Sequence, residues 1–117
     1  MIKKEEIEKN YCGAEDCPIT ATIDVIGGKW KPIIIWLLIP GEKRFGELHR
    51  MIPGIALKVL SRQLKELEAD GIISRKAYPE VPPRVEYSLS EKGRSLTDIM
   101  VSLSEWSRAN LMSADTV

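Results

Sequence analysis

The sequence predicts a mainly α-helical fold that carries one small β-hairpin, which places it in the α+β class. Residues 45–52 and 57–70 each carry apolar side chains at helical spacing, and a Pro-Gly turn separates the two segments. Gly71 stands where the second helix should end, and two strand-like segments follow it, at 72–78 and 84–89. Two helices, a glycine stop and a hairpin in this order predict a winged helix-turn-helix, with the hairpin as the wing.

Two further helices are expected before this motif. Pro18 fits the first turn of one of them, where a missing N–H costs nothing, and Gly27-Gly28 ends it. Periodicity does not separate helix from strand for the apolar segment 30–39. We interpret it as a buried helix, because Pro32 fits a first helical turn but would remove a hydrogen bond from a central strand. Residues 42–44 are predicted to form a short strand that joins the wing.

The second helix of the motif has one apolar face and one basic face. Its inward stripe is predicted from leucines spaced by threes and fours: Leu57, Leu60, Leu64 and Leu67. The opposite face should then present Lys58, Ser61, Arg62 and Lys65, while acidic residues gather at the far end. A recognition helix meets DNA base edges with its N-terminal half, so early cations and late acids favour DNA binding. For this helix alone, an ordinary amphipathic surface helix is the alternative.

The hairpin is predicted to be stiff and basic. Its connector, 79–83, holds three prolines, each of which fixes its own φ and biases the preceding residue toward extended backbone. A stiff connector would hold Arg75, Lys76 and Arg84 against a line of phosphates with little entropy left to lose. Together with Arg44 of the short strand, these residues complete the candidate DNA-binding set.

Charge is distributed unevenly along a chain whose formal net charge is zero. Residues 29–65 hold eight basic and two acidic side chains, a net charge of +6, and the other segments are acidic. A local basic face is what phosphate binding requires, and it can coexist with a neutral total. A solvated lysine-rich face is the alternative explanation of the same pattern.

The length of 117 residues suits one globular domain. We divide it into an N-terminal arm or helix (1–17), a winged-helix core (18–89) and a C-terminal dimerisation helix (90–114). No apolar run approaches the roughly 20 residues of a membrane span, and the charged N-terminus does not resemble a secretory signal. We therefore expect a cytoplasmic protein with no membrane partner.

The sequence does not favour an enzyme. It contains no Gly-rich phosphate loop and no nucleophile elbow, and its single histidine, His49, must serve any catalytic pair. One histidine and two cysteines are also too few for a closed zinc site in one chain. We expect neither a metal nor another cofactor, and no residue pattern assigns a small-molecule effector. His49 is expected on the surface near backbone phosphate, and Trp30 and Trp36 in the core or lining a cavity.

The C-terminal helix is expected to form a dimer interface. Ser90 is a natural N-cap for this helix. Its apolar stripe has no obvious place in a monomer of this size; it consists of Leu96, Ile99, Leu103 and Trp106. Burial against a second copy would form a two-fold homodimer with its recognition helices about 34 Å apart, on a near-palindromic operator.

Several blocks of residues, in fixed order, carry a resemblance to a known family. They are Cys17-Pro18, Gly27-Gly28-Lys29-Trp30, Lys43-Arg44-Phe45 with Glu47-Leu48, Ile52-Pro53-Gly54-Ile55, Leu60 with Leu64-Lys65-Glu66-Leu67, and Tyr78-Pro79-Glu80-Val81-Pro82-Pro83-Arg84-Val85-Glu86-Tyr87. On these blocks the chain resembles the HxlR-type branch of the MarR-like winged-helix regulators. The resemblance implies a homodimeric transcription regulator whose dimer interface is formed by the terminal helices. One departure is Ala56, where the family commonly has Ser or Thr, and this weakens the N-cap of the recognition helix.

Cys17 is a candidate redox sensor. The resemblance implies that, in some members, the Cys-Pro thiol is controlled by oxidation or by electrophiles. A helix N-terminus lowers a thiol pKa, whereas the neighbouring Glu15 and Asp16 disfavour the thiolate. A sensing Cys17 could form a disulfide with Cys12 or with the partner subunit. An inert thiol is the alternative.

We therefore expect a sequence-specific transcription regulator that binds double-stranded DNA and responds, if Cys17 is a sensor, to thiol oxidation or electrophiles. The alternative from another class is a winged-helix module that binds protein without contacting DNA. The cations of the recognition helix and the wing favour the first hypothesis.

Overall fold

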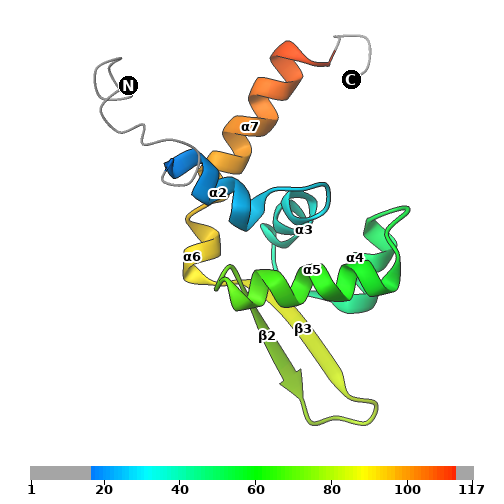
Figure 1. Ribbon diagram of the computed structural model, residues 1–117. Helices are drawn as coiled ribbons and strands as arrows, with labels where there is room; N and C mark the ends of the chain where they lie inside the picture. The colour runs from blue at the N-terminus through cyan, green and yellow to red at the C-terminus, as the bar shows by residue number, and fades with distance from the viewer. Residues whose placement is uncertain (1–16, 113–117) are drawn as a thin grey trace.

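The structure is a computed structural model that describes residues 17–112. Its helices and strands are, in chain order, α2 (Pro18–Ile26), α3 (Lys31–Leu38), β1 (Lys43–Arg44), α4 (Phe45–Met51), α5 (Leu57–Ala69), β2 (Ile73–Tyr78), β3 (Arg84–Leu89), α6 (Glu91–Arg94) and α7 (Thr97–Asn110). Helices α3, α4 and α5 lie together at the end of the β2–β3 hairpin opposite to its connecting loop, while α7 points away from the hairpin (Figure 1). This arrangement confirms the predicted winged helix-turn-helix.

The wing hairpin, β2–β3, belongs to a three-stranded antiparallel sheet in the order β1-β3-β2. The hairpin register runs from Ile73 opposite Leu89 to Tyr78 opposite Arg84. Strand β1 pairs with β3 on the side away from β2, so β3 is the central strand. Both the hairpin and the short strand that joins it are therefore confirmed. Gly71 has a φ of +76°, which is the left-handed conformation expected of the residue that ends α5.

The core lies between α3, α4, α5 and the sheet. Its largest fully buried side chains are Ile34, Ile35, Leu38, Leu48, Leu60, Leu64 and Leu67. The prediction that 30–39 contains a buried helix is confirmed by α3, although Trp36 on its outer side is exposed. The leucine stripe of α5 is confirmed except at Leu57, which is also exposed. Leu57 opens the first turn of α5, before the helix reaches the core.

The C-terminal helix differs from the prediction, because two helices occupy its place. Ser90 caps α6, where its hydroxyl oxygen accepts a hydrogen bond from the Gly93 N–H at 3.0 Å. The Ser95 hydroxyl donates to the Lys92 carbonyl oxygen, a local bond that competes with helix continuation. The chain turns at Leu96 and starts again as α7. None of the described helices combines the length and apolar character that crossing a bilayer requires.

Candidate nucleic-acid interface

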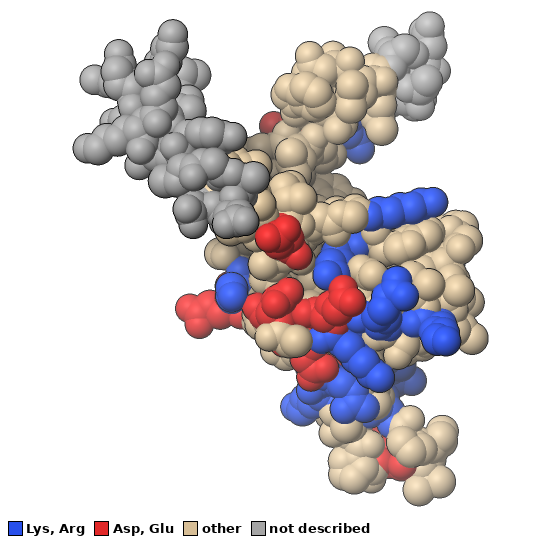
Figure 2. Space-filling view, viewed as in Figure 1, with Lys and Arg blue, Asp and Glu red and all other residues tan. Residues whose placement is uncertain are grey.

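Helix α5 presents its polar side chains away from the core, as predicted. Lys58, Arg62 and Lys65 are exposed and Ser61 is half-buried. Basic side chains gather over the N-terminal half of α5 and the base of the hairpin, whereas acidic ones gather toward the C-terminal end of α5 (Figure 2). The surface therefore has the charge polarity that a recognition helix requires.

A side-chain contact that the sequence did not indicate joins α4 to the turn before α5. The Nε2 atom of His49 lies 3.1 Å from the carbonyl oxygen of Ile55 and is half-buried. This position differs from the expected one on the surface near phosphate, because the ring joins α4 to the segment that enters α5. Ala56 is the N-cap of α5 and provides no side-chain hydrogen bond. The recognition helix therefore begins without the cap that a Ser or Thr would provide.

An ion pair fixes the acidic half of α5 to α3. The Nζ atom of Lys31 lies 2.7 Å from Glu66 Oε1, and the Lys31 side chain is largely buried. The hydrogen bond from Lys31 and its charge lower the pKa of Glu66 below its usual value. Arg62, on the same helix, is 4.0 Å from Glu66 and stays exposed. Sequence reasoning missed Lys31, since this contact joins segments that are far apart in the chain.

The cations of the sheet lie on its two opposite faces. Side chains of paired residues in antiparallel strands share a face. The register therefore places Lys43, Tyr87 and Arg75 in one row across the sheet, and Arg44, Glu86 and Lys76 in a row on the other face. The first row faces α5, because Arg75 and Tyr87 line a hollow of about 300 Å³ together with Ser61, Lys65 and Glu68. The predicted set is thus divided between two faces.

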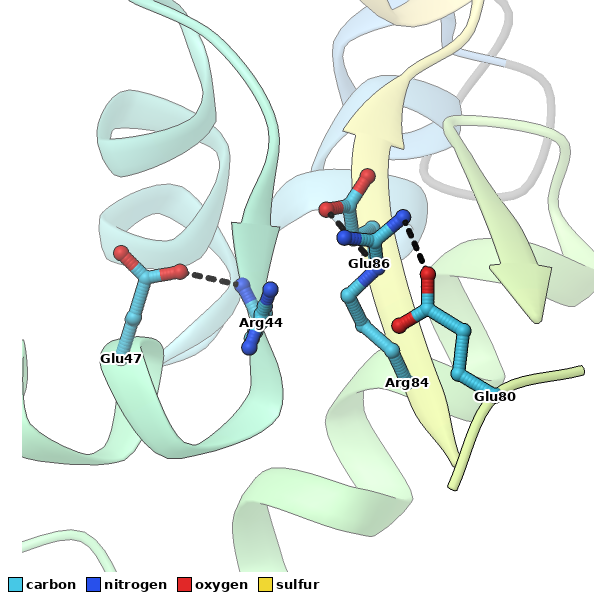
Figure 3. A network of polar contacts seen from close by, with 5 residues as sticks. All are labelled: Arg44, Glu47, Glu80, Arg84 and Glu86. Carbon is cyan, nitrogen blue, oxygen red and sulfur yellow. Dashed lines mark hydrogen bonds and ion pairs between the residues drawn. The ribbon is translucent and has the colours of Figure 1, made fainter. Parts of the chain in front are cut away.

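Arg84 is placed differently from the other predicted cations (Figure 3). Its Nη2 atom lies 3.3 Å from Glu80 Oε1, and its Nε atom lies 3.6 Å from Glu86 Oε2. The guanidinium carbon lies 4.0 Å from the centre of the Tyr78 ring. Figure 3 also shows Glu47 accepting a hydrogen bond from the Arg44 N–H, at 3.0 Å, at the start of α4.

Cys17 is the N-cap of α2 and is half-buried. The backbone N–H groups of Thr20 and Ile19, at the start of α2, favour the thiolate and lower the pKa of the Cys17 thiol below its ordinary value. This is the effect predicted for a thiol at a helix start. Cys12, its candidate disulfide partner, lies outside the described residues.

Helix α7 carries an apolar face without a partner in the described chain. Ile99, Leu103 and Trp106 are 49%, 52% and 57% exposed, and they line a hollow of about 460 Å³ with Asp98 and Ser102. Leu96, the first residue of the predicted stripe, instead packs against the core. Single exposed apolar residues are common, but three on one helix face indicate an interaction surface.

Comparisons with known proteins agree with this architecture. The family model described as HxlR-like helix-turn-helix matches residues 25–115. The chain is 51% identical to YybR of Bacillus subtilis, named an uncharacterized HTH-type transcriptional regulator, over 94% of this chain and 86% of YybR. It matches the structure of the redox regulator HypR in its oxidised form at 52% identity and a TM-score of 0.77, covering 80% of this chain and 97% of HypR. Diamide-treated YodB from B. subtilis matches at 37% identity and a TM-score of 0.68, covering 80% and 94% of the two chains.

Proposed function

This chain belongs to the HxlR-like helix-turn-helix family of transcriptional regulators, and from that premise we propose that it binds a near-palindromic DNA operator as a homodimer. The observation that carries the proposal is the basic N-terminal half of α5 beside a wing with cations at its base. A transcription regulator would act on the chromosome, in the cytoplasm. The relatives are named as regulators and not as enzymes.

Within this interface we assign different tasks to the helix and to the wing. Arg62 is exposed on the outer side of α5, and its planar guanidinium suits bidentate contact with a base edge in the major groove. Lys58, Ser61 and Lys65 would contact bases or flanking phosphates. The sheet cations Arg75, Lys76 and Arg44 would meet the backbone, which positions the protein without reading sequence.

The test compares an operator, selected from random duplexes by the wild-type protein, with unrelated DNA. Arg62→Gln should reduce discrimination between the two by about 5- to 150-fold, the cost of about 1–3 kcal/mol for a lost bidentate base contact. Arg75→Gln should weaken binding to both duplexes and lower the slope of log affinity against log salt by about 0.9 per chain.

Arg108→Gln is the matched control, because Arg108 is an exposed cation of α7, outside the basic surface of α5 and the wing. This variant should change neither the discrimination between operator and unrelated DNA nor the slope of log affinity against log salt. If no duplex were bound in a salt-dependent way, the alternative of a winged-helix module that binds protein would replace this proposal.

We assign the dimer contact to the terminal helices. Ile99, Leu103 and Trp106 of α7 would pack against the same face of the second copy, and Ile19 and Ile23 of α2, which are also exposed, would extend the contact. The proposed division of the chain is a winged core (18–89) that contacts DNA and an arm (1–17) and C-terminal segment (90–114) that join the subunits, with the exposed face of α2 adding to the dimer contact. Two-fold symmetry would place the recognition helices about 34 Å apart.

We further propose that Cys17 makes the regulator responsive to thiol oxidation. HypR is described as a redox regulator in oxidised and reduced forms, and YodB was solved after diamide treatment. The lowered pKa of Cys17 supports a reactive thiolate. Diamide would take two electrons and two protons from a pair of thiols and leave a disulfide, either with Cys12 or across the dimer. Because Cys17 opens α2, such a bond would act on the proposed dimer contact.

Diamide should change operator affinity of the wild type by about tenfold, which requires only about 1.4 kcal/mol of difference between the two states. Cys17→Ser should bind the operator like the reduced wild type and should not respond to diamide. Affinity, thiol count and migration on a non-reducing gel are measured together. Complete thiol loss in the wild type with unchanged operator affinity would assign Cys17 a structural role.

A further inference from the structure

The tip of the wing lacks the basic character of its base. In Figure 2 the tip shows mostly uncharged side chains with a little acidic surface, and the basic side chains stop above it. Between Tyr78 and Glu86, Arg84 is the only basic residue. Val81, in the middle of the connector, is fully exposed. Any phosphate contact by the tip would therefore depend on Arg84.

Arg84 is occupied by contacts within the wing. Its side chain is 27% exposed, and its ion-pair partners Glu80 and Glu86 belong to the connector and to β3. The Tyr78 ring, from β2, lies beneath the guanidinium. The Nε atom is buried and has no hydrogen-bond partner within the described residues; the Glu86 carboxylate pairs with it at 3.6 Å. One guanidinium thus joins β2, the connector and β3.

The electrostatics of this cluster do not favour a phosphate ligand. Two carboxylates surround this one guanidinium, and the Glu80 carboxylate lies on it from the connector. Lys76 and Arg44 lie opposite Glu86 across the sheet, but a phosphate brought to Arg84 would still meet repulsion from Glu80. To reach a phosphate, Arg84 would have to leave both acids and the ring, and the half-buried Glu86 would lose a charge partner. Arg75 is exposed and would leave none of these wing-tip contacts to reach a phosphate.

We propose that Arg84 is a positioning residue, which closes the wing tip and orients the connector against DNA without contacting phosphate. The inference rests on the proposed function, because it requires the wing to meet DNA. Arg84 suits this task because its planar, forked guanidinium can stack on Tyr78 while it pairs with two carboxylates. Lysine has the same charge but neither the plane nor the fork. The cluster fixes both ends of the connector and so places Val81 and the strand cations beside the duplex.

Two substitutions distinguish this role from a phosphate contact. Arg84→Lys retains the charge, so a phosphate contact predicts nearly unchanged affinity, whereas a positioning role predicts a loss of about fivefold. Glu80→Gln removes an acid, so a phosphate contact predicts tighter binding, whereas a positioning role predicts weaker binding. Neither variant should change the salt slope if Arg84 only positions the tip. The opposite pair of results, wild-type affinity for Arg84→Lys and tighter binding for Glu80→Gln, would overturn the proposal.

Coupling and folding controls complete the experiment. The double variant Arg84→Lys with Glu80→Gln should lose little more than either single variant, because both break the same cluster. Tyr78→Phe retains the ring and should bind like the wild type. Hydrogen exchange should rise in the connector of both single variants, while thermal unfolding checks that the domain is intact. The Arg75→Gln variant tests the wing separately: its reduced salt slope supports the proposed function even if the Arg84 results contradict the positioning role.

Discussion

Leu103→Asp is expected to yield a monomer at micromolar concentration and to lower operator affinity at least about a hundredfold. Leu103 lies in the middle of the exposed apolar face of α7, between Ile99 and Trp106. A carboxylate there would have to be buried without a partner in the dimer. Two linked subunits bind two half-sites jointly, and loss of that linkage typically removes a factor of about 10² to 10⁴. Light scattering and operator titration on the same sample measure both effects.

Val101→Asp is the matched control for this variant. Val101 lies on the opposite side of α7 and is partly exposed, so the same charge is introduced in the same helix, away from the proposed contact. It should remain dimeric and bind the operator as tightly as the wild type. A dimeric Leu103→Asp protein, or a wild type that is monomeric at these concentrations, would contradict the assignment of the α7 face.

Local patterns were enough to predict the core of the fold. The leucine spacing predicted the buried face of α5 at Leu60, Leu64 and Leu67, and the alternation in 84–89 predicted β3 at its observed bounds. Both patterns depend only on the period of one element. The break between α6 and α7 was not predicted, because apolar spacing does not show that the Ser95 hydroxyl bonds back to the Lys92 carbonyl oxygen.

The candidate site was predictable in its residue types but not in its geometry. Charge and helix position indicated Arg62 and its neighbours on α5. No sequence pattern indicated that Lys31, at the start of an apolar helix, pairs with Glu66. Arg84 resembled the other wing cations, and only the fold brings Glu80 and Tyr78 to its guanidinium. The missed features are contacts between elements, which depend on register and packing and not on the period of either element.

Gly93→Ala is expected to reduce the free energy of unfolding by about 2–3 kcal/mol, the upper range for overpacking a tight site. A Cβ atom at Gly93 would lie only 2.1 Å from the Ile72 carbonyl oxygen and 3.2 Å from Leu89 Cδ2. The Ile72 carbonyl cannot move aside freely, since it also accepts a hydrogen bond from the Ser90 N–H at 2.9 Å. Relief of the clash therefore requires α6 to move away from the segment that joins α5 to β2.

Urea unfolding at one fixed protomer concentration measures this loss, because dimerisation makes apparent stability depend on concentration. Gly41→Ala is the control, since its added Cβ would meet no atom within 4 Å and its φ is not positive. It should unfold like the wild type, while Gly93→Ala should lower the melting temperature by about 10 °C. Equal stability of the two variants would contradict the close packing of α6.

Because α6 connects the winged core to α7, a displaced α6 should also change the spacing of the recognition helices. Gly93→Ala should therefore bind the operator more weakly than the wild type, even at temperatures where the variant is folded.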